Sequence, residues 1–114
     1  PPAPRELWVR SAGQYLRITP ARITRVQAER DYARIHADGR TYLHNENLSE
    51  LERLLPPGEF IRVHRSTLVR IDAVERVDVG AFSSLALVLR DGDVVRVGRT
   101  HTVAVRARLM RGPS

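Results

Sequence analysis

The most restrictive feature of this sequence is the dipeptide Asp38-Gly39, which separates two short runs in which apolar and polar residues alternate, residues 32–37 and 40–44. A two-residue hairpin turn needs positive φ at both central positions, which Asp-Gly adopts readily. Alternation with a period of two is typical of a strand that buries one face. We therefore predict an antiparallel β-hairpin here, and this pattern favours a fold built from hairpins.

Related patterns occur elsewhere in the chain. Ser11-Ala12-Gly13 separates an alternating pair, Leu7 and Val9, from a second pair, Leu16 and Ile18. Asp91-Gly92 separates residues 85–90 from residues 94–97, and a two-residue turn there places Arg90 opposite Asp93. Further short strands are predicted at residues 23–28, 60–64 and 74–79. The strands thus outnumber every other element.

Two segments follow a helical pattern instead. Asn47 is a plausible N-cap, with Glu50 three residues later reaching back to its amide in a capping box. A leucine stripe follows until Pro56-Pro57 stops the helix. A second short helix is predicted over residues 101–110, with an apolar stripe made of Val103, Ala107 and Met110. The predicted fold class is mainly β, with short antiparallel β-sheets, hairpins and two short helices.

The length of 114 residues fits one domain. The opening Pro1-Pro2-Ala3-Pro4 is typical of a linker, so we expect residues 1–5 to link an upstream region to a domain at residues 6–111, with a tail at residues 112–114. No apolar run approaches the roughly 18 residues of a membrane span. We expect no membrane contact by this domain and a cytoplasmic location. The absence of cysteine excludes disulfides and thiolate chemistry.

The net charge of +6 comes from 19 basic residues, all of them arginine. Residues 1–43 have eight arginines against four acids, residues 61–76 have four against two, and residues 96–114 have five and no acid. Residues 44–60 and 77–95 are acidic. If the three basic stretches meet, they form a face suited to a polyanion. Alternatively, the basic stretches lie apart on a solvated surface and their charges never converge. The lack of lysine has an alternative explanation of its own, which is GC-rich codon usage.

The residues that could serve catalysis or metal binding do not assemble in the predicted elements. His36 and His44 lie on opposite faces of their hairpin, and His64 with Ser66 has no recognisable orienting acid. We therefore expect no enzyme, no cofactor and no metal site. The six aromatic residues are spread along the chain, so most are expected in the core or in hairpin packing rather than in a base-stacking platform. Without a long basic helix, duplex DNA would have to be bound through loops.

The run from Phe60 to Val69, FIRVHRSTLV, resembles the signature of LytTR-type DNA-binding domains, the output modules of a class of bacterial response regulators. The hairpin at Asp38-Gly39, the leucine helix and a closing VRVGR before the last helix agree in order and spacing. The resemblance implies a domain whose loops enter successive major grooves of double-stranded promoter DNA. It also implies binding as a dimer to direct-repeat half-sites, and an upstream receiver or sensor domain.

Transferred by position, the resemblance assigns the base-contacting side chains to three loops. They are Arg30 and Asp31 in the first loop, Arg65 after the signature histidine, and Arg99 before the final helix. Seven further residues are expected to contact the DNA backbone or support the interface: His64, Ser66, Arg62, Arg70, Arg96, Thr100 and His101. Two positions depart from the family pattern. Arg70 stands where asparagine is common, and Gly98 stands where serine is common.

Each of the central residues also has a purely structural interpretation. His64 could be a half-buried strand histidine bonded to a backbone carbonyl. Arg65 could pair with Glu59 or Asp72, and Arg99 could cap the preceding carbonyls or pair with Asp93. Arg62 and Arg96 fit phosphate contacts or plain surface, which would affect positioning rather than specificity. The alternative function is a small basic β-domain that acts as an RNA-binding or protein–protein interaction module.

Overall fold

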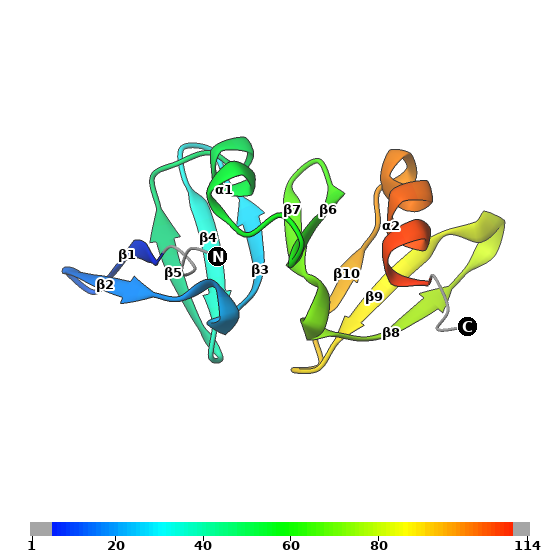
Figure 1. Ribbon diagram of the computed structural model, residues 1–114, viewed down its shortest axis with the longest axis horizontal. Coiled ribbons are helices and arrows are strands. Elements are labelled where there is room, and N and C mark those ends of the chain that lie inside the picture. Colours follow the sequence, from blue (N-terminus) through cyan, green and yellow to red (C-terminus); the bar gives the residue numbers. More distant parts are fainter. Residues whose placement is uncertain (1–5, 111–114) are drawn as a thin grey trace.

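The computed structural model describes residues 6–110 and consists of two antiparallel sheets with two short helices (Figure 1). The larger sheet has the strand order β2-β1-β5-β4-β3-β7-β6, and the smaller one has the order β10-β9-β8. The strands are β1 Leu7–Ser11, β2 Gln14–Ile18, β3 Ile23–Ala28, β4 Ala33–Ala37, β5 Arg40–His44, β6 Phe60–His64, β7 Thr67–Arg70, β8 Val74–Val79, β9 Leu85–Leu89 and β10 Val94–Arg96. The predicted mainly β fold class is confirmed.

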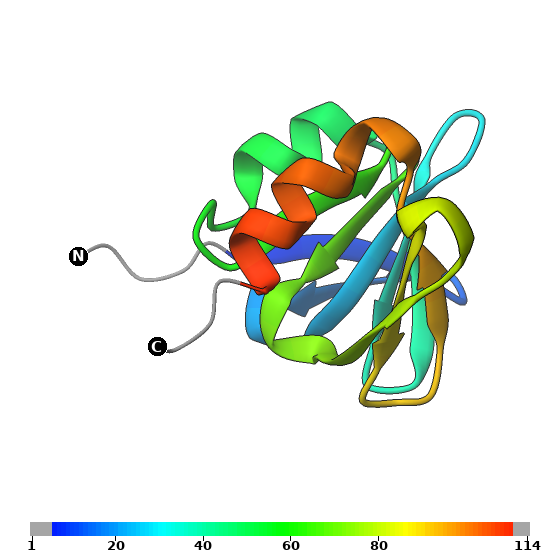
Figure 2. The same ribbon diagram turned by 90° about the vertical axis from the view of Figure 1, so that its right-hand side faces the viewer.

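The helices are α1 Leu48–Leu54 and α2 Thr102–Leu109, and both lie on the same side of the sheets (Figure 2). Short 3-10 turns connect several strands: η1 Pro20–Arg22, η2 Ile71–Ala73, η3 Ala81–Ser83 and η4 Arg99–His101. The expected linker at residues 1–5 and tail at residues 112–114 lie outside the described residues. The domain boundaries therefore stay a prediction.

The hairpin at Asp38-Gly39 forms as predicted, because both residues adopt positive φ, 54° and 75°. The register places His36 opposite Thr41, and His44 lies opposite Ala33 on the other face. The first hairpin turns at Ala12-Gly13, which also have positive φ. On the outer face of this hairpin, the Cζ atom of Arg17 lies 4.8 Å from the centroid of the Trp8 ring. The Cζ atom of Arg10 lies 5.9 Å from the centroid of the Tyr15 ring.

The predicted two-residue turn at Asp91-Gly92 is wrong. Leu89 donates its N–H to the carbonyl of Asp93 at 2.8 Å, so the loop has three residues, and only Gly92 in it has positive φ. A three-residue hairpin loop needs one left-handed position rather than two, which agrees with the single positive φ. The extra loop residue also changes the register of the two strands. Arg90 therefore does not face Asp93. Arg90 instead donates to the carbonyl of Asp72, and Asp93 pairs with Arg25 of β3 at 3.3 Å.

Helix α1 begins at its predicted cap, where the Asn47 side chain accepts from the Glu50 N–H at 2.8 Å. The Glu50 carboxylate does not close the capping box, since it binds Arg53. The predicted stripe of α2 is also wrong, because Val103 and Met110 are exposed. Val105 is fully buried instead, and Leu109 packs against the same core. This face belongs to the core that also contains residues of β6 and β9, so tertiary packing selects it and residue spacing alone does not.

The hairpin of β6 and β7 lies between two hydrophobic cores (Figure 1). Phe60 and Leu68 belong to the core under β1–β5 and α1, whereas Ile61, Val63 and Val69 belong to the core under β9, β10 and α2. Strand β7, which the sequence pattern did not predict, is buried on both faces and so lacks alternation. The turn between these strands is consequently held from both sides.

No helix within residues 6–110 is both long and apolar enough to cross a membrane. No group of three or more histidine or acidic side chains in the same range has the arrangement of a metal site.

Candidate nucleic-acid interface

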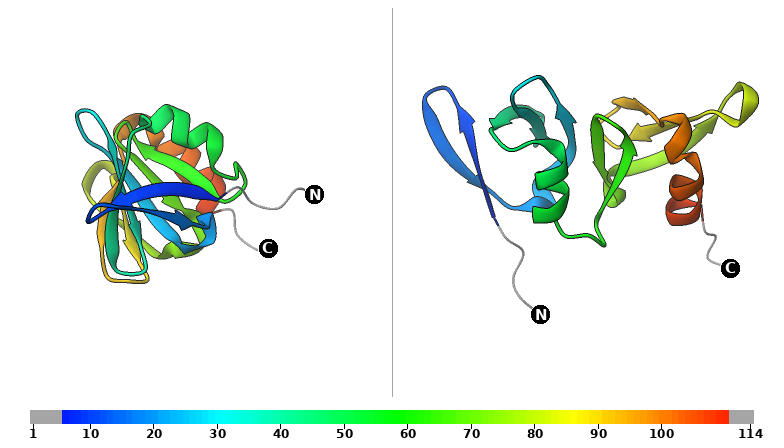
Figure 3. Two further views of the ribbon diagram at one scale, coloured as in Figure 1. Left: turned by 90° about the vertical axis from the view of Figure 1, so that its left-hand side faces the viewer. Right: turned by 90° about the horizontal axis from the view of Figure 1, so that it is seen from above.

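Three loops from distant parts of the sequence lie next to one another at one end of the strands. They are residues 29–32 between β3 and β4, residues 65–66 between β6 and β7, and residues 97–101 before α2 (Figure 1; Figure 3). Two backbone hydrogen bonds join them. Ala28 donates to the carbonyl of Ser66 at 2.8 Å, and Gly98 donates to the carbonyl of Val63 at 2.7 Å. The three predicted base-contacting loops therefore form one continuous row.

The central turn presents Arg65 to solvent from a fixed base. The Nδ1 atom of His64 lies 2.9 Å from the Ser66 hydroxyl and accepts from the Ser66 N–H at 3.2 Å. His64 is half-buried, as expected, but its partner is Ser66 rather than a backbone carbonyl. These contacts bridge the turn, so Arg65 projects from a backbone that is already ordered.

The Arg62 side chain also stabilises this turn. Its Nε donates to the carbonyl of His64 at 3.0 Å and a terminal nitrogen donates to the carbonyl of Arg65 at 2.6 Å. Its second terminal nitrogen binds the Glu52 carboxylate of α1 at 2.9 Å. Arg62 thus uses three of its five N–H donors inside the protein, and two of these bonds support the turn.

The third loop is packed closely onto the central turn. Gly98 lies against His64 and His101, since a Cβ atom at Gly98 would lie 3.3 Å from the Cδ2 atom of each ring. Strand β6 bulges between Arg62 and His64, and as the edge strand of its sheet it offers the Val63 carbonyl to Gly98. Thr102 donates its hydroxyl to the Arg99 carbonyl at 2.8 Å. The backbone of Arg99 is therefore fixed while its side chain stays exposed.

The first loop has an internal ion pair of its own. Arg34 donates to both carboxylate oxygens of Glu29, at 3.0 and 3.1 Å, and this hydrogen bonding lowers the pKa of Glu29. Glu29 also donates its backbone N–H to the carbonyl of Tyr32. Because Arg34 neutralises Glu29, the exposed charges of the loop are Arg30 and Asp31.

Carboxylate pairing separates the arginines into two groups. Of the 17 arginines within residues 6–110, eight have a carboxylate within 4.0 Å, and Arg30, Arg65 and Arg99 are among the other nine. The ion-pair interpretations of Arg65 and Arg99 do not hold, because Asp72 pairs with Arg70, Asp93 pairs with Arg25, and Glu59 forms no ion pair within the described chain. The three guanidinium groups are free to bind an anion or a base edge.

Not every predicted residue lies in the row. Arg70 is at the far end of β7, where its Nε donates to the carbonyl of Ile23 at 2.7 Å and a terminal nitrogen lies 3.9 Å from Asp72. Arginine at this position thus ties β7 to β3. Arg96 and Thr100 are exposed on either side of Gly98 and Arg99. Sequence reasoning missed the brace from Arg34 to Glu29, although the separation of five residues across a loop would have permitted it.

Comparison with known proteins shows which family this chain belongs to. The family model described as the LytTr DNA-binding domain matches residues 13–110. The chain belongs to this family. The family is one of DNA-binding domains, and such domains occur in response regulators and in other transcription regulators.

Similar LytTr-containing proteins include the sensory transduction protein LytT of Bacillus subtilis, which is 30% identical over 78 residues, 65% of this chain and 32% of that protein. The CO-responsive transcriptional regulator RcoM of Rhodospirillum rubrum is 32% identical over 96 residues, 81% of this chain and 39% of that protein. This LytTr chain therefore spans about a third of the length of these relatives.

A solved structure has the same fold. It is the LytTr DNA-binding domain of a putative methyl-accepting/DNA response regulator from Bacillus cereus, with a TM-score of 0.85 and 23% identity. The match covers 91% of this chain and 95% of that chain. At this identity the likeness establishes the fold, so the roles of individual LytTr side chains have to be argued from their own contacts.

Proposed function

We propose that this domain reads the sequence of double-stranded DNA by placing the row of three loops in the major groove. The observation that supports this most directly is that Arg30, Arg65 and Arg99 are exposed, have no carboxylate partner within residues 6–110 and lie on adjacent loops at one end of the molecule. A guanidinium group binds the O6 and N7 acceptors of guanine with two hydrogen bonds. Three such groups on a rigid edge can test several base pairs together.

In this proposal Arg65 and Arg99 each bind a guanine edge, because both project from backbones fixed by hydrogen bonds. A preordered backbone lowers the conformational entropy lost on binding. Arg30 binds a base of the neighbouring base-pair step or neutralises a phosphate there. The Asp31 carboxylate accepts a hydrogen bond from a cytosine amine and so does not face a phosphate. Arg96 and Thr100 contact the flanking backbone, and His64, Ser66, Arg62 and His101 hold the loops in place.

At the level of the whole protein, we propose that the domain is the output end of a transcription regulator in the bacterial cytoplasm. An upstream receiver or sensor domain supplies the input. Two copies bind a direct-repeat promoter site, one on each half-site. The similarity to regulators about twice as long as this chain supports the presence of further domains.

Selection from a random duplex library, followed by affinity measurements on selected and scrambled duplexes across a salt series, tests the readout. We expect the Arg65→Ala and Arg99→Ala variants to lose about 1–3 kcal/mol of binding free energy on the selected duplex and to relax the base preference. Arg40→Ala is the matched control, since Arg40 is exposed at the opposite end of the sheet beside the Asp38-Gly39 turn. Equal affinity for selected and scrambled DNA at every salt concentration would sink the proposal. Tighter binding to structured RNA would favour the alternative module.

A further inference from the structure

The tip between β8 and β9 has an unusual backbone and an unusual side chain. Phe82 and Ser83 both lie in the left-handed region, with φ of 56° and 62°, and neither is glycine. Gly80 donates to the Ser84 carbonyl at 2.8 Å and Ser84 donates to the Ala81 carbonyl at 3.1 Å, which closes the tip. The Phe82 side chain is fully exposed. Phe82 is thus an exception to the expectation that most aromatic residues lie in the core or in hairpin packing.

Neither feature helps the domain to fold. Left-handed backbone costs about 1–2 kcal/mol at a residue with a Cβ atom, and two in succession are uncommon. A fully exposed phenylalanine returns none of this through burial. The left-handed backbone of the tip is therefore energetically unfavourable, and it holds an aromatic ring in solvent. Such an arrangement is typical of a binding surface.

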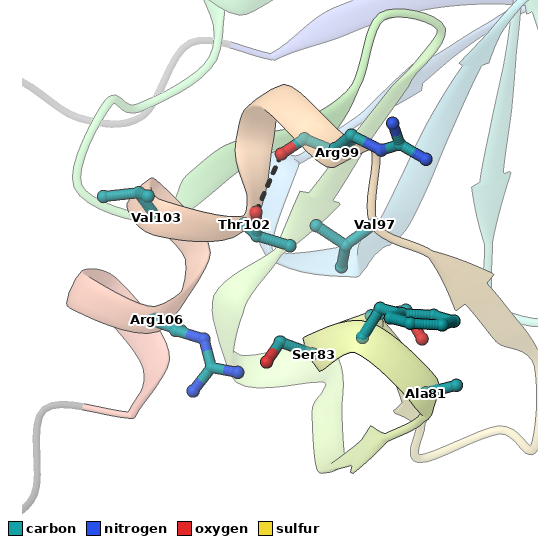
Figure 4. A pocket seen from close by; sticks show the side chains of 9 residues that line it. Ala81, Ser83, Val97, Arg99, Thr102, Val103 and Arg106 are labelled. Carbon is teal, nitrogen blue, oxygen red and sulfur yellow. Dashed lines mark hydrogen bonds between the residues drawn. The ribbon is translucent and has the colours of Figure 1, made fainter.

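A pocket of about 630 Å³ lies between this tip and α2 (Figure 4). Arg106 reaches toward Ser83 from the helix, Val97 lies at the back, and Arg99 lies above Val97. None of the nine described residues that line the pocket is acidic. Within residues 6–110, neither Arg99 nor Arg106 has a carboxylate within 4.0 Å. The exposed Val103 adds a second apolar group to the wall.

We propose that the Phe82 tip and Arg106 form a fourth DNA-contacting element, which binds the sugar–phosphate backbone where the duplex leaves the base-reading row on the Arg99 side. This proposal rests on the proposed function. Arg99 lines the pocket and also ends the row, so a duplex bound along the row runs past the pocket. Arg106 pairs with a phosphate, and the Phe82 ring packs on the apolar face of a deoxyribose.

The charge of the pocket favours this occupant over a protein. A nucleic acid backbone alternates one anion with one apolar sugar face, which matches guanidinium groups interspersed with Phe82 and Val103. A second copy of this chain is the competing occupant, and the test below separates it from the DNA backbone. Contacts of this kind fix orientation and strengthen binding without reading bases.

The test uses duplexes that contain one selected half-site, so that a second copy has no adjacent site. One duplex extends about ten base pairs beyond the selected bases on both sides, and the other is trimmed at the last selected base pair. We expect the wild-type domain to bind the trimmed duplex roughly threefold to tenfold more weakly than the long one. Phe82→Ala and Arg106→Gln should each bind the long duplex more weakly than the wild type does, and each should lose less affinity on trimming than the wild type loses.

The matched controls are Arg108→Gln on the same helix and Val94→Ala, an exposed apolar residue of β10, which should behave as wild type. Thermal melting checks that each variant folds. If the wild type selects no sequence, the proposed function fails. If it does select one, the flanking contact is overturned by equal affinity on both duplexes, or by variant losses that are the same on both. Losses confined to two-site duplexes would identify a second copy as the occupant and would also overturn it.

Discussion

The backbone N–H of Gly98 donates to the carbonyl oxygen of Val63 at 2.7 Å, and this bond ties the loop of Arg99 to the turn of Arg65. Val63 belongs to the hairpin shared by the two cores, whereas Gly98 follows the last strand of the smaller sheet. The relative position of two proposed base-reading arginines, more than thirty residues apart in the sequence, thus depends on one short contact. Gly98 packs closely against His64, which leaves little room for a side chain at position 98.

The Gly98→Val variant should disturb this joint. A Cβ atom already meets the His64 and His101 rings at 3.3 Å, so a branched side chain has to displace both. We expect a loss of about 1–3 kcal/mol in the free energy of unfolding. The loss of selectivity between selected and scrambled DNA should be larger, because Arg65 and Arg99 are no longer held in register. Urea unfolding and duplex binding measure the two effects, and Gly98→Ala should show a smaller version of each. Unchanged selectivity in Gly98→Val would contradict the role of the joint.

Replacing Arg62 should reduce base preference as well as affinity. The side chain donates to the carbonyls of His64 and Arg65, so Arg62→Ala leaves the central turn without its brace. We expect unfolding to become easier by about 1–2 kcal/mol. Affinity should fall more for selected than for scrambled DNA. Glu52→Gln is the comparison, because it removes the ion pair and keeps both bonds to the turn. Equal losses on all duplexes would mean that Arg62 acts on phosphate instead.

Stability should fall on mild acidification because of His36. Burial, and then the positive charge of Arg25, lower the pKa of His36, which also faces Arg34, Asp91 and Asp93. Its Nε2 atom is buried and has no hydrogen-bond partner among the described residues.

A histidine whose folded pKa is lowered binds fewer protons when folded, so stability is complete above the unfolded value of about 6.5 and is lost as pH falls toward the folded value. Burial also lowers the pKa of His44, whose Nδ1 accepts from the Glu46 N–H. Urea midpoints between pH 7.5 and 5 should therefore decline in the wild type, less so in His36→Gln. They should decline least when His44→Gln is added. A flat wild-type profile is the result that would contradict this.

Relieving the backbone of the β8–β9 tip should stabilise the domain. Ser83 has φ of 62°, a conformation that glycine adopts without a steric penalty. Ser83→Gly should raise the free energy of unfolding by about 0.5–1 kcal/mol after the greater entropy of the unfolded glycine is counted. Thermal melting measures it, with Ser84→Gly as the control, since Ser84 has φ of −66° and should gain nothing. A loss of stability in Ser83→Gly would show that its side chain supports the tip.

The elements that depend on neighbouring residues could be predicted from the sequence. The Asp38-Gly39 turn, the Asn47 cap and the proline stop of α1 each result from φ preferences or a hydrogen bond within four residues. The turn that presents Arg65 was not predicted, because strand β7 lacks the alternation by which the other strands were recognised. The β9–β10 loop shows the limit of this reasoning. Asp-Gly is compatible with loops of two or three residues, and the pairing of Leu89 with Asp93 selects the longer one.

Everything that makes the candidate site a single surface is decided by tertiary structure. The sequence by itself determined which loops are basic and which strands surround them, because charge and alternation are local properties. Whether Arg30, Arg65 and Arg99 meet, and whether Asp72 and Asp93 pair with them or with Arg70 and Arg25, depends on how two cores pack against the β6–β7 hairpin. The buried face of α2 and the exposure of Phe82 depend on the same packing. Contacts between residues far apart in the chain are set by the balance of many burials at once, and no short pattern encodes that balance.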